Sequence, residues 1–201
     1  MIRLAINGYG RIGRCLLRAL YESGRRQQMQ VVAINEPADL ATIAHLTKYD
    51  STHGRFPAEV GFDTGQLVVN GDRIAVSHHA DLNDLDWAGR KIDIVLEYDS
   101  LDQLERHLGP SVAKVLLSQP GLAPIKPIVW GINQHHVAPD DRIISAASCT
   151  SNCITPVVDV IHRAFTIECG VITTIHSAMN DQPVIDAYHH TDLRKTRASG
   201  Q

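Results

Sequence analysis

The fold of this chain is decided by residues 4–13, whose sequence is LAINGYGRIG. A short apolar run, residues 4–7, leads into a glycine-rich turn. The glycines of this turn have the spacing G-x-G-x-x-G and are Gly8, Gly10 and Gly13. Apolar residues then recur at helical spacing as far as Leu20, and a second apolar run follows at residues 31–35. This order of strand, glycine turn, helix and strand predicts a βαβ crossover.

Glycines at this spacing, between a strand and a helix, are typical of a dinucleotide-binding site. The first permits a tight turn, the second lets the backbone approach a pyrophosphate, and the third lets helix and strand pack closely. The backbone N–H groups of Arg11 and Ile12 would hold the phosphates at the helix start. Glu36 ends the second apolar run, where a carboxylate accepts hydrogen bonds from the adenosine ribose and repels a 2′-phosphate. The spacing alone also fits an ordinary turn, but with strand, helix and acidic residue in place it predicts NAD rather than NADP.

Strand and helix patterns continue to alternate along the chain. A helix is expected at residues 40–46 and a shorter one at 101–108, and a hairpin at 66–77 turns at Asn70-Gly71. Further strands are expected at residues 92–96, 112–117, 128–131 and 143–144. This alternation predicts an α/β fold, a doubly wound parallel sheet of Rossmann type, as a dinucleotide-binding domain over residues 1–147.

Composition narrows the class of protein. The 201 residues carry a net charge of −3 and no extended basic run, so neither nucleic acid nor a membrane surface is an expected partner. No apolar stretch reaches the roughly 20 residues that a bilayer span needs. Four cysteines in a chain of this size do not make a disulfide framework. We expect a cytoplasmic protein with reduced thiols.

A second region opens at Ser148, between the β-like run 142–146 and a helical run that extends from Cys149 to residue 165. A cysteine at such a junction lies at the positive end of a helix, which favours its thiolate and makes it a candidate nucleophile. A small buried apolar residue is the alternative interpretation. The apolar run 170–176 predicts a strand that ends at His176, the natural base for this thiol, although a buried core histidine is also possible. No set of residues has the spacing of a metal site.

Four segments resemble the glyceraldehyde-3-phosphate dehydrogenase family in order and spacing. They are residues 7–14, 49–54, 147–153 and 173–176. The sequence from His176 to His189 looks most like the bacterial D-erythrose-4-phosphate dehydrogenases, since triose enzymes usually have a threonine at the position of Met179. The resemblance implies an NAD-dependent dehydrogenase acting on a small phosphorylated aldehyde, in pyridoxal phosphate biosynthesis, and a homotetramer.

The resemblance also implies roles for individual residues. Cys149 would form a hemithioacetal with the aldehyde, and His176 would be the base. Hydride transfer to NAD would leave a thioester, which water hydrolyses in the erythrose enzymes and phosphate attacks in the triose enzymes. Ser118 would lie against the cofactor. Residues expected to contact substrate are Ser148, Thr150, Arg194 and Lys195.

This chain departs from the family pattern at several positions. Tyr98-Asp99-Ser100 replaces a Thr-Gly turn beside the cofactor, and Ala80 and Ala146 replace an arginine and an asparagine. Lys195 replaces a substrate-binding arginine and loses its bidentate fork.

Family members also continue past Gln201, so residues 148–201 are expected to be the start of a truncated α+β catalytic domain. We expect a fragment of a longer enzyme or a truncated relative, without turnover of its own. The alternatives are a triose-phosphate dehydrogenase and a non-catalytic NAD-binding remnant.

Overall fold

The computed structural model describes residues 1–98, 103–177 and 197. Contacts between Cα atoms divide the chain into two units, Met1–Val160 and Ile161–Gln201. The helix α3 (Cys149–Phe165) begins in the first unit and ends in the second.

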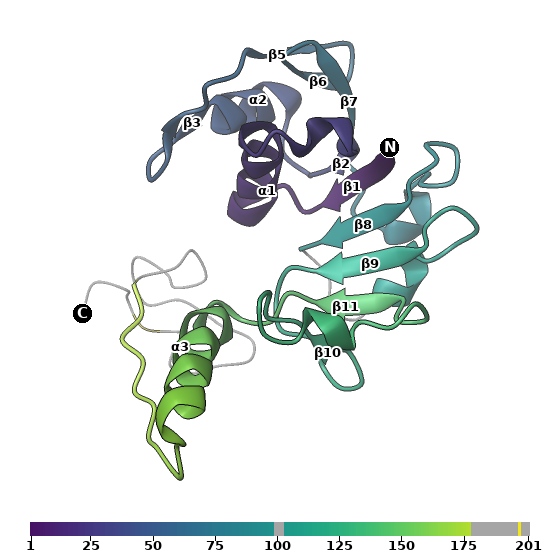
Figure 1. The fold of residues 1–201 in the computed structure, drawn as a ribbon. Coiled ribbons are helices and arrows are strands. Elements are labelled where there is room, and N and C mark those ends of the chain that lie inside the picture. Colours follow the sequence, from purple (N-terminus) through teal and green to yellow (C-terminus); the bar gives the residue numbers. More distant parts are fainter. Residues whose placement is uncertain (99–102, 178–196, 198–201) are drawn as a thin grey trace. The chain divides into compact units, whose positions relative to one another are not determined.

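A mixed sheet forms the centre of the first unit (Figure 1). Its order in the described residues is β10-β11-β9-β8-β1-β2-β7-β6-β5. The strands are β1 (Ile2–Asn7), β2 (Met29–Asn35), β5 (Val60–Asp63), β6 (Gln66–Val69), β7 (Asp72–Ser77), β8 (Ile94–Glu97), β9 (Lys114–Leu117), β10 (Lys126–Pro127) and β11 (Ile143–Ser145). All neighbours from β10 to β7 are parallel, and β6 and β5 extend the edge as antiparallel strands. The expected doubly wound α/β fold is therefore confirmed.

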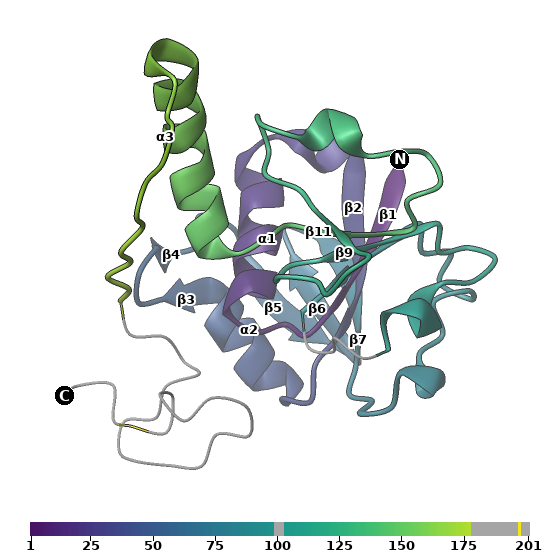
Figure 2. The same cartoon turned by 90° about the horizontal axis from the view of Figure 1, so that it is seen from below.

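Helices cover both faces of this sheet (Figure 2). On one side lie α1 (Arg11–Glu22) and α2 (Leu40–Lys48), and on the other the short 3-10 helices η2 (Leu82–Asp84) and η3 (Leu104–His107). Two further 3-10 helices are η1 (Arg25–Gln27) and η4 (Gln134–His136). The side chains of β1 alternate between the two faces of the sheet and so contribute to both apolar clusters. Leu4 and Ile6 pack in the cluster that contains the apolar residues of α1, and Ala5 packs in the cluster on the opposite face.

Local signals place several element ends where the sequence predicts them. Helix α1 ends before Gly24, whose φ of 69° is left-handed, as expected of a glycine after a helix. The turn between β6 and β7 has φ of 48° at Asn70 and 85° at Gly71, so both central residues adopt the left-handed backbone of a type I′ hairpin. Helix α3 has the predicted limits.

A small hairpin outside the main sheet, β3 (Tyr49–Asp50) and β4 (Gly54–Arg55), was not expected from the sequence. Arg18 anchors it to α1, because its guanidinium donates to the carbonyl of Gly54 at 3.0 Å and lies 5.0 Å from the ring centre of Phe56. An arginine that is only 6% exposed therefore has a structural role here.

Two predicted strands are wrong. At residues 128–131 the chain turns instead, since the side chain of Asn133 accepts the N–H of Val129 and Gly131 has a left-handed φ of 92°. Residues 170–176 have no strand assignment, and no ladder pairs them with other described residues. An apolar run becomes a strand only where a neighbour accepts its backbone hydrogen bonds.

The helix predicted at 101–108 begins outside the described residues, and its described part is the 3-10 helix η3.

Candidate functional site

The reversal of strand order gives the sheet its switch point between β1 and β8. Strand β1 pairs with β2 on one side and β8 on the other, and the chain crosses the sheet in opposite directions from there (Figure 1). Ligands of doubly wound sheets bind outside the carboxyl ends of strands at such a point. The residues that follow β1 and β8 are Gly8 and Tyr98.

The glycine turn after β1 has the geometry that a pyrophosphate site requires. Gly8 has a φ of 84°, and its N–H donates to the carbonyl of Asn35 at 3.0 Å. A Cβ on Gly13 would lie 2.8 Å from the carbonyl oxygen of Gly8, so only glycine permits this close packing of turn and helix. Helix α1 begins at Arg11, which places the N–H groups of Arg11 and Ile12 in its first turn.

Tyr9, between the first two glycines, fastens this turn to the core. It is 2% exposed, and its hydroxyl lies 3.0 Å from Thr47 Oγ1 in α2. Because Thr47 donates its own hydrogen to the carbonyl of Ile43, Tyr9 is the donor in this pair. Burial raises the pKa of Tyr9 well above its usual value.

Glu36 lies beside the glycine turn, as the sequence predicts. Its Oε2 accepts the N–H of Tyr9 at 2.8 Å and its Oε1 accepts the N–H of Ala38 at 3.4 Å. An ionised carboxylate offers about four acceptor sites, so two backbone bonds leave capacity for ribose hydroxyls. Glu36 therefore both braces the turn and fits the ribose role.

A buried polar network beneath this edge was missed by the sequence reasoning. The Nδ2 of Asn7 donates to Glu97 Oε2 at 2.9 Å, and the Nδ2 of Asn35 donates to Asn7 Oδ1 at 2.8 Å. Glu97 also bonds to His107 Nε2, while Trp87 Nε1 donates to His107 Nδ1 at 2.9 Å. A signal was available for part of it, since Asn7, Asn35 and Glu97 are the polar residues that end three apolar strands.

The network also defines the tautomer of His107. An indole nitrogen can only donate, so His107 Nδ1 is the acceptor and the ring hydrogen lies on Nε2, directed to Glu97. All five side chains are less than 10% exposed. The network therefore ties together the carboxyl ends of β1, β2 and β8, on which the glycine turn and Glu36 depend.

Ser118, the other predicted cofactor residue, lies at the same edge. It follows β9, and both its N–H and its hydroxyl bond to the carbonyl oxygen of Glu97, at 3.0 and 3.1 Å. The structure thus brings Ser118, Glu36 and the three glycines to one edge of the sheet. Their roles in cofactor binding stay predictions.

Tyr98 also belongs to this edge, and its side-chain position was not expected. A Cβ built on Gly10 would lie 3.6 Å from Cε1 of the Tyr98 ring. The N–H of Tyr98 donates to the carbonyl of Asn7 at 3.0 Å, which holds its backbone beside the turn. The ring therefore lies against the second glycine of the fingerprint.

The segment before Cys149 has an unusual backbone. Ala147 is buried and has a left-handed φ of 59°, and its N–H donates to Ser145 Oγ at 3.0 Å. The Nδ2 of Asn152 donates to the carbonyls of Ala146 and Ser148, at 2.8 and 2.9 Å. Helix α3 then begins at Cys149, which is exposed.

The first turn of α3 also has a side-chain cap. Ser148 Oγ accepts the N–H of Ser151 at 3.0 Å, as a residue before a helix does. Cys149 and Thr150 are the first two residues of the helix, so their N–H groups lie in its first turn, at the positive end of its dipole. No disulfide joins the four cysteines, all of which lie in the described residues.

His176 lies in the second unit, and the structure does not place it relative to Cys149. Its ring is exposed, and Nδ1 lies 2.7 Å from the carbonyl oxygen of Ser177. A carbonyl only accepts, so Nδ1 carries the hydrogen and the lone pair of a neutral ring lies on Nε2. The pairing of the two residues stays a prediction, and Arg194, Lys195 and Met179 lie outside the described residues.

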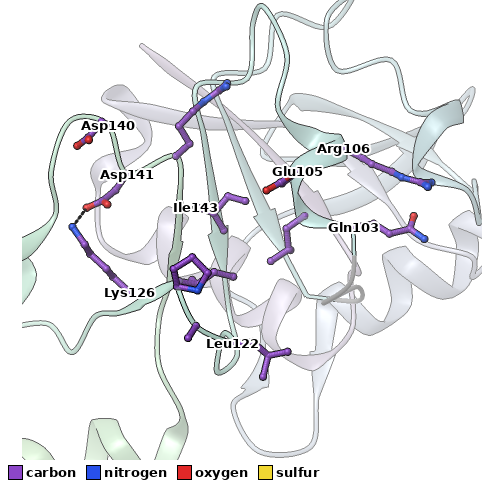
Figure 3. Close-up of a pocket in the computed structure, with 13 residues that line it drawn as sticks. Gln103, Glu105, Arg106, Leu122, Lys126, Asp140, Asp141 and Ile143 are labelled. Atoms are coloured by element: carbon purple, nitrogen blue, oxygen red, sulfur yellow. Dashed lines mark hydrogen bonds and ion pairs between the residues drawn. The ribbon is translucent and has the colours of Figure 1, made fainter.

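A hollow of about 870 Å³ lies elsewhere on the first unit (Figure 3). It is lined by residues 103–106 at η3, by residues 122–126 at the start of β10 and by residues 140–143 at the start of β11, whereas the glycine turn follows the carboxyl end of β1. Lys126 on its wall is paired with Asp141 at 2.8 Å. Because its charges are of both signs and it is far along the sheet order from β1, it is not part of the candidate site.

Comparison with protein families agrees with this geometry. Residues 2–101 match the family described as glyceraldehyde 3-phosphate dehydrogenase, NAD binding domain. Residues 148–201 match the glyceraldehyde 3-phosphate dehydrogenase C-terminal domain. The first match contains the glycine turn and Glu36, and the second begins one residue before Cys149. In the described residues, no helix is both long and apolar enough to cross a bilayer.

Proposed function

The chain belongs to the glyceraldehyde-3-phosphate dehydrogenase family, with NAD as its cofactor, and from this premise we propose that it serves the oxidation of D-erythrose 4-phosphate to 4-phosphoerythronate. The observation that carries the proposal is the position of Cys149, an exposed thiol at the first residue of α3, in the chain of an NAD-binding family. The proposed domain boundary lies between residues 147 and 148, which the start of the C-terminal match supports.

In the proposed reaction the Cys149 thiolate adds to the aldehyde carbon. The carbonyl oxygen takes up a proton to give a hemithioacetal, and His176 is proposed to take that proton back as the carbon is oxidised. Bound NAD supplies the hydride acceptor. The carbon is then a thioester of Cys149, and water cleaves it to the acid and the regenerated thiol.

The backbone around Cys149 supports this use of the thiol. Its N–H lies in the first helical turn, where it can donate to the developing oxyanion. Ser148 and Thr150 flank it and are the proposed substrate contacts. The left-handed Ala147 and the two hydrogen bonds of Asn152 hold the approach to the helix in one conformation.

The choice of erythrose over triose phosphate depends on the sequence around Met179, which resembles the erythrose enzymes. Methionine cannot donate the hydrogen bond that a threonine gives to the phosphate of the triose. We include in the proposal the family's homotetramer and a cytoplasmic location, with a small phosphorylated aldehyde as the partner molecule.

Thiol chemistry offers a test that does not depend on turnover. At pH 7, brief iodoacetamide treatment should label Cys149 before Cys15, Cys153 and Cys169, because only Cys149 is at a helix start. With NAD present, erythrose 4-phosphate should slow this labelling more than glyceraldehyde 3-phosphate does. The reason is that the sulfur of a hemithioacetal is bonded to the substrate carbon and no longer reacts as a thiolate. Peptide mapping by mass spectrometry gives the labelled fraction at each cysteine.

Cys153 provides the internal control, because it is exposed in the same helix but lies beyond the first turn. Faster labelling of Cys153 than Cys149 would refute the nucleophile assignment. Stronger protection by glyceraldehyde 3-phosphate, together with NADH formation that requires inorganic phosphate, would replace the erythrose proposal by the triose reaction.

A further inference from the structure

The second glycine of a dinucleotide fingerprint has a defined purpose. It lacks a side chain so that the pyrophosphate can approach the backbone from the direction in which a Cβ would project. In this chain that direction is not open. The Cε1 and Cδ1 atoms of Tyr98 lie 3.6 and 3.9 Å from the Cβ position of Gly10, which is ordinary van der Waals contact.

We propose that Tyr98 covers the pyrophosphate subsite at Gly10 and that its ring must move aside before a dinucleotide can bind. Tyr98 is then a residue that determines the affinity for NAD, through steric competition rather than through a contact with the bound cofactor. The inference concerns the cofactor site and rests on the binding of NAD at the glycine turn.

The backbone of Tyr98 makes this position persistent. Its N–H donates to the carbonyl of Asn7 at 3.0 Å, and its carbonyl accepts from Gln119 Nε2 at 3.3 Å. Asn7 and Glu97, the residue before Tyr98, belong to the buried network that ties the strand ends together. The Cα of residue 98 is therefore anchored at the switch point, directly beside the glycine turn.

The side chain, in contrast, has the means to rotate. It is half-buried, and in the described part of the chain its hydroxyl has no hydrogen-bond partner. Rotation about χ1 therefore breaks no hydrogen bond among the described residues, and it takes the ring away from Gly10. Tyr98 can uncover the subsite while the backbone stays in place.

The other parts of the site remain compatible with a dinucleotide. Glu36 keeps acceptor capacity for the ribose, and the N–H groups of Arg11 and Ile12 lie in the first turn of α1. The obstruction is thus confined to the middle of the dinucleotide, the pyrophosphate. A ligand that ends at the ribose, such as adenosine, would not meet the ring.

Population arithmetic gives the expected size of the effect. A ring that covers Gly10 in about nine molecules out of ten lowers the apparent NAD affinity about tenfold, because only the uncovered fraction binds. Removing the ring should raise the apparent NAD affinity by the same factor. The size of the gain measures how far the covered state is favoured in the free protein.

Titration calorimetry on the full chain tests the proposal with NAD and adenosine as ligands. Tyr98→Ala and Tyr98→Thr should bind NAD about tenfold more tightly than the wild type, with adenosine affinity unchanged. Tyr98→Phe keeps the ring and should match the wild type for both ligands. Tyr49→Ala removes a tyrosine from the β3–β4 hairpin and should also leave NAD affinity unchanged.

Circular dichroism and thermal melts establish that each variant is folded before it is titrated. If folded Tyr98→Ala and Tyr98→Thr bind NAD no more tightly than wild type, Tyr98 does not cover the subsite, while measurable NAD binding still supports the cofactor site. An equal gain for adenosine would also overturn the proposal, since it would indicate a general change in the site. If neither the wild type nor folded Tyr98→Ala and Tyr98→Thr bind NAD, both proposals are overturned: that Tyr98 covers the subsite, and that the glycine turn binds NAD.

Discussion

At the scale of single residues, one carboxylate has two tasks in this site. Glu36 accepts the N–H of Tyr9 at 2.8 Å and so holds the glycine turn against the end of β2. The same group is the proposed partner of the adenosine ribose. In that proposed role its negative charge would also repel the 2′-phosphate of NADP, so charge and hydrogen bonding make separate contributions that a substitution can distinguish.

The change Glu36→Gln removes the charge and keeps an oxygen that can accept the Tyr9 N–H. The wild type should bind NAD more tightly than NADP. In the variant the ratio of the two affinities should be about tenfold smaller, mainly because NADP binds more tightly. Calorimetric titrations with both dinucleotides measure the ratio. Glu59→Gln, at an exposed site before β5, is the control and should leave the ratio unchanged.

Equal affinity of the wild type for the two dinucleotides would remove the ribose role from Glu36. In that case the carboxylate would retain only its bond to the glycine turn.

At the scale of elements, a cluster at the amino end of β7 joins three segments. Asp72 accepts the hydroxyl of Tyr21 from α1 at 2.8 Å and two guanidinium nitrogens of Arg26 from η1, both at 2.5 Å. The hydrogen bond from Arg26 is the main reason that the pKa of Asp72 is lowered. The pKa of Tyr21 is raised, first by burial and then by Asp72.

A lowered carboxyl pKa makes stability depend on pH in a defined direction. The contribution of Asp72 is present above the usual carboxyl pKa of about 4 and is lost as the pH falls through the lowered folded value. Asp72→Asn should therefore lower the urea midpoint clearly at pH 7 and by a smaller amount at pH 3. Asp84→Asn is the control, because Asp84 is an exposed residue of η2.

An equal loss at both pH values would contradict the electrostatic origin of the effect. It would show instead that the amide disturbs packing between α1, η1 and β7.

At the scale of the whole molecule, several large apolar side chains that are close together in sequence are almost fully exposed. Phe165 at the end of α3 is 82% exposed, and Val171 and Ile175 in the second unit are 95% and 98% exposed. Exposed apolar groups close together in sequence favour association, because burial removes them from water. The charge of −3 over 201 residues provides little repulsion against it.

The chain should therefore self-associate as its concentration rises. Sedimentation velocity over a range of concentrations should show increasing mass for wild type, and the double change Val171→Lys and Ile175→Lys should reduce it. Leu122→Lys alters another apolar side chain, 73% exposed in the first unit, and should have less effect. A monomer at all concentrations, or an equal effect of Leu122→Lys, would contradict the prediction.

Much of the fold follows from local sequence signals. The glycine turn between β1 and α1, the Asn70-Gly71 hairpin and the limits of α3 all appear as predicted. Each of these depends on residues within a few positions of one another, through backbone freedom at glycine, helical periodicity or a cap. Local reasoning was wrong at residues 128–131 and 170–176, where an apolar run has no strand ladder.

The sequence by itself determined the βαβ unit, the glycine spacing and the place of Cys149 at a helix start, because these are properties of neighbouring residues. Only the tertiary structure decided that Trp87 orients His107 toward Glu97 and that the Tyr98 ring lies against Gly10. These contacts join residues from distant parts of the chain, and sheet order and packing alone bring them together. Periodicity records which side chains face the core, but it carries no information about which partner each one meets there.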